Sequence, residues 1–219
     1  MADEAQLIGE VIESSTTEFV AESRELHSPP AFGSFVKVRL DGIEGAHAAD
    51  EEEDPFVSTA GSCSRVPAIY GVVYQATTAP IDVGRKLRAF WKDEEQLRKE
   101  QPEISEWLLV TNFRAIIIAY CANGAVCQYL PPKPPKLFTS VHQCDPDEVR
   151  DITSRMEFLR TLANSRNAPS EEVIAACIRE ANSARGGDFD FLIAAGKELA
   201  NLLKDDYDRL QAIMRRVAP

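Results

Sequence analysis

Short β-type segments, separated by glycine, proline and polar turns, fill the first two thirds of the chain and constrain its fold more than any other feature. Residues 7–14 alternate apolar and polar side chains in part, residues 36–40 alternate strictly, and residues 68–77 are rich in β-branched and aromatic residues. Short strands joined by frequent turns are typical of a small all-β unit. The expected strands are 7–14, 18–21, 35–40 (half buried), 68–77, 107–122 and 125–130. If these strands form a barrel, a final segment, 137–141, closes it or lies along its side.

The Asn-Gly dipeptide at 123–124 predicts a two-residue β-hairpin, because these residues tolerate the positive φ angles of a type I′ turn. In that hairpin Cys121 lies opposite Val126 and Cys127 lies opposite Tyr120, so the two thiols point to opposite faces of the sheet. They are therefore not expected to share a metal ion or to form a redox pair. The chain has only 3 histidines and no Cys-x-x-Cys motif, so no metal site is expected.

The hydrophobic period becomes helical in two places. Residues 83–101 carry apolar side chains at helical spacing, which predicts an excursion with a short helix that stops at Pro102. From Asp145 to the end we expect four amphipathic helices, the first with Asp145 as N-cap and Glu148 three residues after the cap. The apolar stripe of this first helix runs from Val149 to Leu162, and the other three helices begin near Pro169, Phe189 and Asp205.

The formal net charge of -11 disfavours nucleic-acid binding, because contacts to phosphates depend on clustered lysines and arginines. Seven acidic residues and no basic residue lie between Asp41 and Asp54, within a loop expected over residues 41–67. We expect this stretch to be a solvated loop, and an acidic docking segment is the alternative.

The 5 scattered cysteines favour reduced thiols over a disulfide framework. No stretch approaches the roughly 20 apolar residues that span a bilayer. The first residues carry acids where a secretory signal carries basic residues. We therefore expect a cytoplasmic protein without a membrane span.

Known catalytic motifs do not occur in the sequence. The Gly196-Lys197 pair lacks both the earlier glycine and the following Ser or Thr of a phosphate-binding loop, and it lies in a helical pattern. No Gly-x-Ser-x-Gly elbow is present. The sequence therefore predicts a protein that is not an enzyme and has no cofactor, and a small-molecule enzyme with a polar cleft between barrel and helices is a third hypothesis.

Two segments are candidates for binding a partner. The first interleaves basic and apolar residues, and Leu87, Phe90 and Trp91 are expected to turn inward while the charges stay in water. It suits nucleic acid or an acidic protein surface, and its candidate residues are Arg85, Lys86, Arg88 and Lys92. The second is an extended polyproline stretch, either a stiff connector or a ligand for an aromatic-lined groove. Its candidate residues are Pro131, Pro132, Lys133, Pro134, Pro135 and Lys136.

Four of these segments together resemble a known family. Residues 9–19 read Gly-Glu-Val-Ile-Glu-Ser-Ser-Thr-Thr-Glu-Phe, residues 33–38 Gly-Ser-Phe-Val-Lys-Val, residues 70–73 Tyr-Gly-Val-Val and residues 131–135 Pro-Pro-Lys-Pro-Pro. Residues 6–141 thus resemble the HAS barrel, the small β-barrel shared by HerA-type DNA translocases and the N-termini of ATP synthase α and β subunits. The resemblance implies a noncatalytic barrel that packs against neighbouring subunits in a ring above a motor domain.

The chain departs from that family in three ways. The ATPase domain is missing, a helical segment stands in its place, and residues 83–101 lengthen the barrel. A solitary barrel with a helical tail is similar to small proteins of cyanobacteria and plastid-bearing lineages. The resemblance therefore implies docking or assembly and not DNA translocation.

We expect an α+β fold with a HAS-like six-stranded antiparallel β-barrel over residues 6–144 and a helical domain over residues 145–219. The first functional hypothesis is a noncatalytic interaction or assembly module that docks another protein or an oligomeric complex through the barrel, and self-association is left open. The alternative is a nucleic-acid accessory factor that uses residues 85–92.

Overall fold

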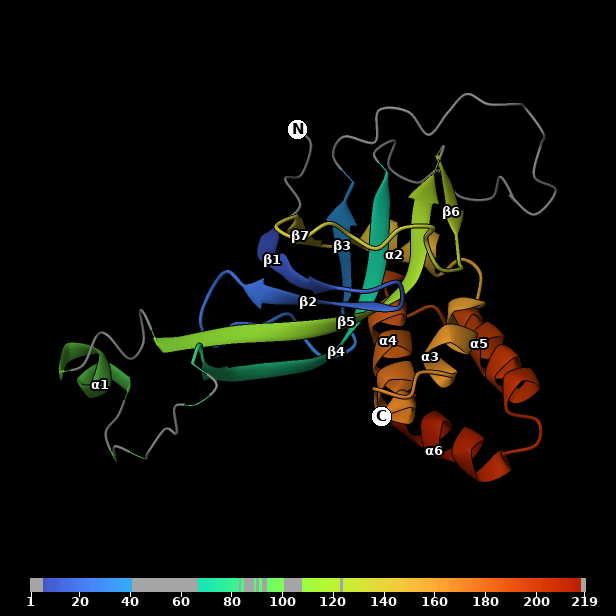
Figure 1. The fold of residues 1–219 in the computed structure, drawn as a ribbon. Helices are drawn as coiled ribbons and strands as arrows, with labels where there is room; N and C mark the ends of the chain where they lie inside the picture. Colours follow the sequence, from blue (N-terminus) through green and yellow to red (C-terminus); the bar gives the residue numbers. More distant parts are fainter. Residues whose placement is uncertain are drawn as a thin grey trace, which may run out of the picture.

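The computed structural model describes residues 6–40, 67–82, 84, 89, 91, 94–100, 108–122 and 124–217. Strands occupy the first part of these ranges and most helices the last part (Figure 1). The strands are β1 (Leu7–Ser14), β2 (Glu18–Ser23), β3 (Phe35–Arg39), β4 (Ala68–Pro80), β5 (Leu109–Ala122), β6 (Ala125–Cys127) and β7 (Ser140–Gln143). The helices are α1 (Glu94–Glu100), α2 (Pro146–Ile152), α3 (Phe158–Ala163), α4 (Ser170–Ala184), α5 (Phe189–Leu202) and α6 (Tyr207–Val217).

Six antiparallel strands form a closed barrel. The strand order is β2-β1-β7-β3-β4-β5, and β2 pairs with β5 to close the ring. β6 pairs with β5 outside the ring. Closure removes the exposed sheet edges that an open sheet of this size would have. The expected α+β fold, with a six-stranded antiparallel barrel and mainly C-terminal helices, is therefore confirmed.

The last strand of the barrel is β7, which pairs with both β1 and β3. The segment expected at 137–141 thus leads into the strand that closes the barrel. Pairing begins only at Ser140, however, and Leu137 and Phe138 lie exposed before it.

The β5–β6 hairpin has the register expected from its Asn-Gly turn. Cys121 pairs with Val126, and Tyr120 pairs with Cys127. The two cysteines therefore lie on opposite faces of the sheet, as predicted. β6 has only 3 residues, fewer than predicted, and the side chain of the next residue, Gln128, binds the helices.

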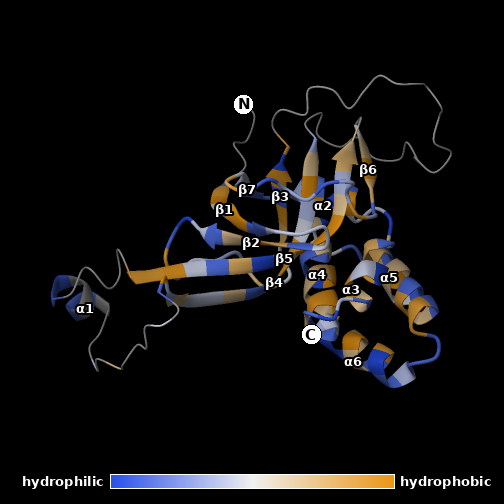
Figure 2. Ribbon diagram, viewed as in Figure 1, coloured by the Kyte–Doolittle hydropathy of each residue, from blue (hydrophilic) through white to orange (hydrophobic). Residues whose placement is uncertain are grey.

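Two hydrophobic cores share the barrel strands. One fills the barrel interior and includes Phe19, Ile69 and Phe113. The other lies on the outer face of β3, β4 and β5, where residues such as Phe35 and Ile118 pack with residues of α2 to α6. Figure 2 shows apolar residues on these strands and on helix α4 beside them.

β3 is buried on both faces, so the expectation of a half-buried strand is wrong. Val36 and Val38 face the barrel interior, whereas Phe35 belongs to the core under the helices. Lys37, on the same side as Phe35 by strand alternation, is only 5% exposed. The helices therefore cover a strand face that the sequence pattern assigned to solvent.

The C-terminal described residues form five helices, and the prediction of four is wrong because the first expected helix is divided into α2 and α3. Gln128 lies between these two helices. Its Nε2 donates to the backbone oxygens of Ile152 and Arg155, both at 2.8 Å, and its Oε1 accepts from the N–H of Phe158 at 3.1 Å. Backbone groups at helix ends lack intrahelical partners, and this buried amide supplies them. The break therefore depends on a residue distant in the sequence.

The predicted start of the first helix is confirmed. Asp145 Oδ1 accepts from the N–H of Glu148 at 2.8 Å, and Glu148 Oε2 accepts from the N–H of Asp145 at 3.0 Å. The other carboxylate oxygen of Glu148 pairs with Lys37 of β3. One carboxylate therefore caps α2 and fastens it to the barrel.

Gly33 allows the barrel to approach helix α4 closely. Its φ is +84°, and a Cβ at this position would lie 2.4 Å from the Cβ of Ala176 and 2.9 Å from the carbonyl carbon of the same residue. The N–H of Gly33 also donates to the backbone oxygen of Val73 at 2.8 Å, which holds it against β4. A larger residue would push α4 away from the barrel.

We predict that Gly33→Ala lowers the free energy of unfolding by about 3 kcal/mol, because a left-handed backbone and an overpacked contact each cost about 1–2 kcal/mol. Gly124→Ala is the matched control, since Gly124 also has a positive φ (+77°) but a Cβ added there would meet no atom within 4 Å. The control should lose only about 1 kcal/mol. Urea denaturation measures both, and equal losses would contradict the close approach of α4.

Candidate functional site

The polyproline stretch is fixed at both ends. Gln128, just before it, is bound between α2 and α3. Near the other end, Ser14 Oγ donates to the backbone oxygen of Pro135 at 2.6 Å, and the N–H of Phe138 donates to the backbone oxygen of Val11 at 2.8 Å. The stretch is therefore an anchored connector between the helices and β1.

Only part of the polyproline stretch faces solvent. Pro131 and Pro135 are buried, whereas the exposed residues are Pro132, Lys133, Pro134 and Lys136. Grooves that recognise polyproline contact prolines on successive turns of the extended helix. Because two of the four prolines face the protein itself, the connector interpretation is favoured over the groove ligand.

Large apolar side chains are exposed on both sides of the prolines. The exposed fractions are 49% for Tyr129, 42% for Leu130, 49% for Leu137 and 76% for Phe138. Single exposed apolar residues are normal, but several on one short segment are typical of an interaction site. Residues 129–138, with these side chains and both lysines, are called the 129–138 segment below.

Phe138 combines exposure with a strained backbone. Its φ is 62°, in the left-handed region that costs an L-residue about 1–2 kcal/mol. Its N–H and the oxygen of Thr139 are both bonded to Val11, at 2.8 and 3.0 Å. These bonds hold the backbone of Phe138 in its strained conformation and keep its ring in solvent. Burial of the ring therefore does not compensate for the strain. Such strain concentrates at functional sites.

The sequence placed Leu137 and Phe138 in the segment that closes or flanks the barrel and gave no indication that both are exposed. Two apolar residues shortly before the buried Val141 resemble the start of a strand. The preceding prolines were the available signal that strand pairing begins later, since proline cannot donate to the ladder.

The other candidate residues, Arg85, Lys86, Arg88 and Lys92, lie outside the described residues, as does the acidic stretch 41–54. The short helix expected in the excursion is present as α1. Trp91 was expected to turn inward on a helix, but it is 95% exposed and is not helical.

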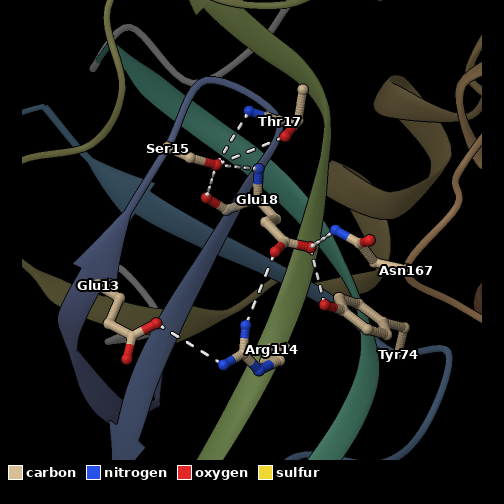
Figure 3. A network of polar contacts seen from close by, with 7 residues as sticks. All are labelled: Glu13, Ser15, Thr17, Glu18, Tyr74, Arg114 and Asn167. Carbon is tan, nitrogen blue, oxygen red and sulfur yellow. Dashed lines mark hydrogen bonds and ion pairs between the residues drawn. The ribbon is translucent and has the colours of Figure 1, made fainter.

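A polar network around Glu18 joins the barrel to the helical region (Figure 3). Glu18 Oε2 accepts from Tyr74 Oη at 2.7 Å and from Asn167 Nδ2 at 3.4 Å, and Glu18 Oε1 lies 3.7 Å from a terminal nitrogen of Arg114. Ser15 Oγ accepts from the N–H of Glu18 at 3.0 Å. The sequence did not reveal this network, because its members come from separate strands and from the loop before α4. Both carboxylate oxygens of Glu18 have partners. We therefore interpret the network as a structural contact between the barrel and the helical region.

A second polar cluster is buried beneath α2. Lys37 and Glu148 are 5% and 9% exposed, and they pair with each other. Burial, and then the charge of Glu148, raises the pKa of Tyr70 and of Cys144 well above their usual values. Cys144 therefore stays a thiol at neutral pH, and it lacks the lowered pKa of a reactive cysteine.

The cysteines differ in their redox state. Cys127, Cys144 and Cys177 are free and buried, whereas Cys121 is disulfide-bonded. The expectation of reduced thiols is therefore wrong for Cys121. Across the part of the chain that the structure describes, no group of three or more His, Cys, Asp or Glu residues is placed to hold a metal ion.

Within the same part of the chain, no helix combines the length and apolar character needed to cross a membrane.

No protein-family model matches the sequence, and no curated protein is significantly similar to it. The resemblance to the HAS barrel therefore stays a prediction.

We predict that Phe138→Gly leaves the free energy of unfolding unchanged or raises it, because glycine relieves the left-handed strain and little burial is lost. Phe138→Ala is the control that removes the ring and keeps the strain. The glycine variant should exceed the alanine variant by about 1 kcal/mol in urea denaturation. A glycine variant less stable than the alanine variant would contradict the strained conformation.

We predict that Tyr74→Phe destabilises the protein by about 2 kcal/mol, because it removes a hydrogen bond to a carboxylate. Burial and the hydrogen bond to Glu18 raise the pKa of Tyr74 from 10.0 to about 12. The unfolded chain therefore loses this proton first, and Tyr74 makes stability fall as the pH rises from 10 towards 12. Urea denaturation at several pH values should show a smaller alkaline loss in Tyr74→Phe. Tyr207→Phe, at an exposed tyrosine, should resemble the wild type, and an alkaline loss unaffected by Tyr74→Phe would argue against this assignment.

Proposed function

We propose that this protein is a noncatalytic interaction module that docks another protein through its barrel, with the 129–138 segment as the contact surface. The observation that carries the proposal is Phe138, an aromatic residue that is 76% exposed and held at a φ of 62°. Aromatic residues in central, well-packed positions contribute most to binding energy at protein interfaces. The strained backbone of Phe138 lowers the stability of the fold, and such a cost is typical of residues that are retained for binding.

The anchoring of the segment also supports the proposal. The side chain of Gln128 is hydrogen-bonded to the helices. The backbones of Pro135 and Phe138 are both hydrogen-bonded to β1. A segment that is already ordered loses less conformational entropy when it binds. The exposed apolar residues on both sides of the prolines therefore form a preorganised surface.

The resemblance to the HAS barrel agrees with a docking or assembly role, since that barrel packs subunit against subunit. Self-association is one form that such docking takes.

We predict that the double variant Leu137→Ala and Phe138→Ala weakens partner binding by about thirtyfold or more, because removal of an aromatic anchor costs about 2 kcal/mol or more. The measurement is quantitative affinity purification from the native cell with tagged full-length protein. Phe189→Ala is the matched control, since Phe189 is also a solvent-exposed phenylalanine (71%) and lies on α5.

The proposal requires that the same proteins co-purify with the wild type and with Phe189→Ala and are lost with the double variant. Retention of every partner by a folded double variant would contradict it. Alanine at Lys133 and Lys136 tests the polar part of the same surface and should weaken capture to a smaller extent.

A further inference from the structure

The 129–138 segment differs in charge from the molecule that carries it. The whole chain has a net charge of -11, whereas residues 129–138 contain Lys133 and Lys136 and no acidic residue. Both lysines are exposed, and the structure gives neither an ion-pair partner among the described residues. The segment is therefore a small cationic strip on an acidic protein.

The cationic and apolar groups of this strip lie close together. Lys133 and Lys136 are three residues apart, so their Cα atoms are separated by at most about 10 Å. Lys136 directly precedes the exposed Leu137 and Phe138. One partner surface of ordinary size can contact all four side chains at once.

We propose that the partner surface is acidic and apolar, with a pocket for Phe138 and carboxylates that pair with Lys133 and Lys136; this inference rests on the proposed function. An acidic partner is repelled by most of this chain and attracted to the strip, so the charge pattern directs it to this segment. The apolar residues supply affinity, and the lysines supply orientation and association rate.

The chemistry of the strip favours a protein over nucleic acid as the partner. Two lysines provide few phosphate contacts, and nucleic-acid affinity grows with the number of phosphates neutralised. Leu130 and Leu137 are aliphatic side chains, exposed to 42% and 49%. Unlike the aromatic Tyr129 and Phe138 of the same segment, these two leucines have no planar face for base stacking, but they fill an apolar protein pocket well.

The test uses the folded full-length chain and a set of short fluorescein-labelled peptides. The peptides share one pattern of Leu and Phe and differ only in carrying Glu, Gln or Lys at the remaining positions, and a single-stranded oligonucleotide completes the set. Fluorescence anisotropy at low salt and at about 0.15 M salt measures each dissociation constant. We expect the Glu peptide to bind most tightly and to weaken as salt rises.

The paired variants are Lys133→Glu with Lys136→Glu, and the matched control Lys197→Glu with Lys204→Glu. All four lysines are exposed and the change in net charge is the same, but the control lysines lie on α5 and just after it. The first pair should weaken Glu-peptide binding by about tenfold relative to the control pair. Lys133→Arg with Lys136→Arg should bind within about twofold of the wild type, because it keeps both charges.

Three results would overturn the inference: no binding of the Glu peptide at micromolar protein, equal binding by the two reversal variants, or tighter binding of the Lys peptide or of the oligonucleotide. The proposed function fails separately. It fails if the variant with Leu137→Ala and Phe138→Ala still captures its partners. If that variant loses its partners but Lys133→Glu with Lys136→Glu binds the Glu peptide as tightly as the control pair does, the docking role is retained and only the acidic partner is rejected.

Discussion

The C-terminal helices pack on the outer face of β3, β4 and β5, and the rest of the structure depends on this contact. A barrel strand normally has one face in the interior and one in solvent. Here the outer face is also a core, in which Phe35, Tyr70 and Ile118 lie with residues of α2 to α6. The glycine at position 33 permits the approach of α4, and the Lys37–Glu148 pair fastens α2. Apolar burial is the main driving force in this contact, because isolated buried ion pairs contribute little net stability.

The same contact fixes the surface that we propose for docking. Gln128 is placed by α2 and α3, which are themselves held on the barrel, and the connector then runs to β1. The backbone of Phe138 is held by Val11 at that end. Under the proposed function, partner binding is linked to the packing of the helices on the barrel through the chain between Gln128 and Phe138. A shift of the helices would move the first anchor of the segment and change the shape of the proposed contact surface.

Local sequence patterns predicted the elements well where a local cause decides them. The Asn-Gly turn set the register of the β5–β6 hairpin, and Asp145 with Glu148 formed the predicted cap. The strand and turn patterns located the strands, and the resemblance to the HAS barrel implied the closed six-stranded barrel that they form.

The sequence failed where a distant residue decides the outcome. The burial of Lys37 and the break between α2 and α3 depend on Glu148 and Gln128, which lie far away in the chain. The exposure of Phe138 was missed for the same reason, since its conformation is set by Val11. The proline stretch itself was found from the sequence, but which prolines face solvent depends on the barrel against which they pack.

Native-state hydrogen exchange on the full chain tests the central claim most directly, because it measures the free energy at which each element opens. If the helices and the barrel share one core, the interior amides of α4 and those of Ile69 to Val72 in β4 exchange only through the same global opening. Their exchange free energies then agree with each other and with the free energy of unfolding. Exchange of α4 through an opening several kcal/mol below that of β4 would show that the helices leave the barrel independently and would contradict the account.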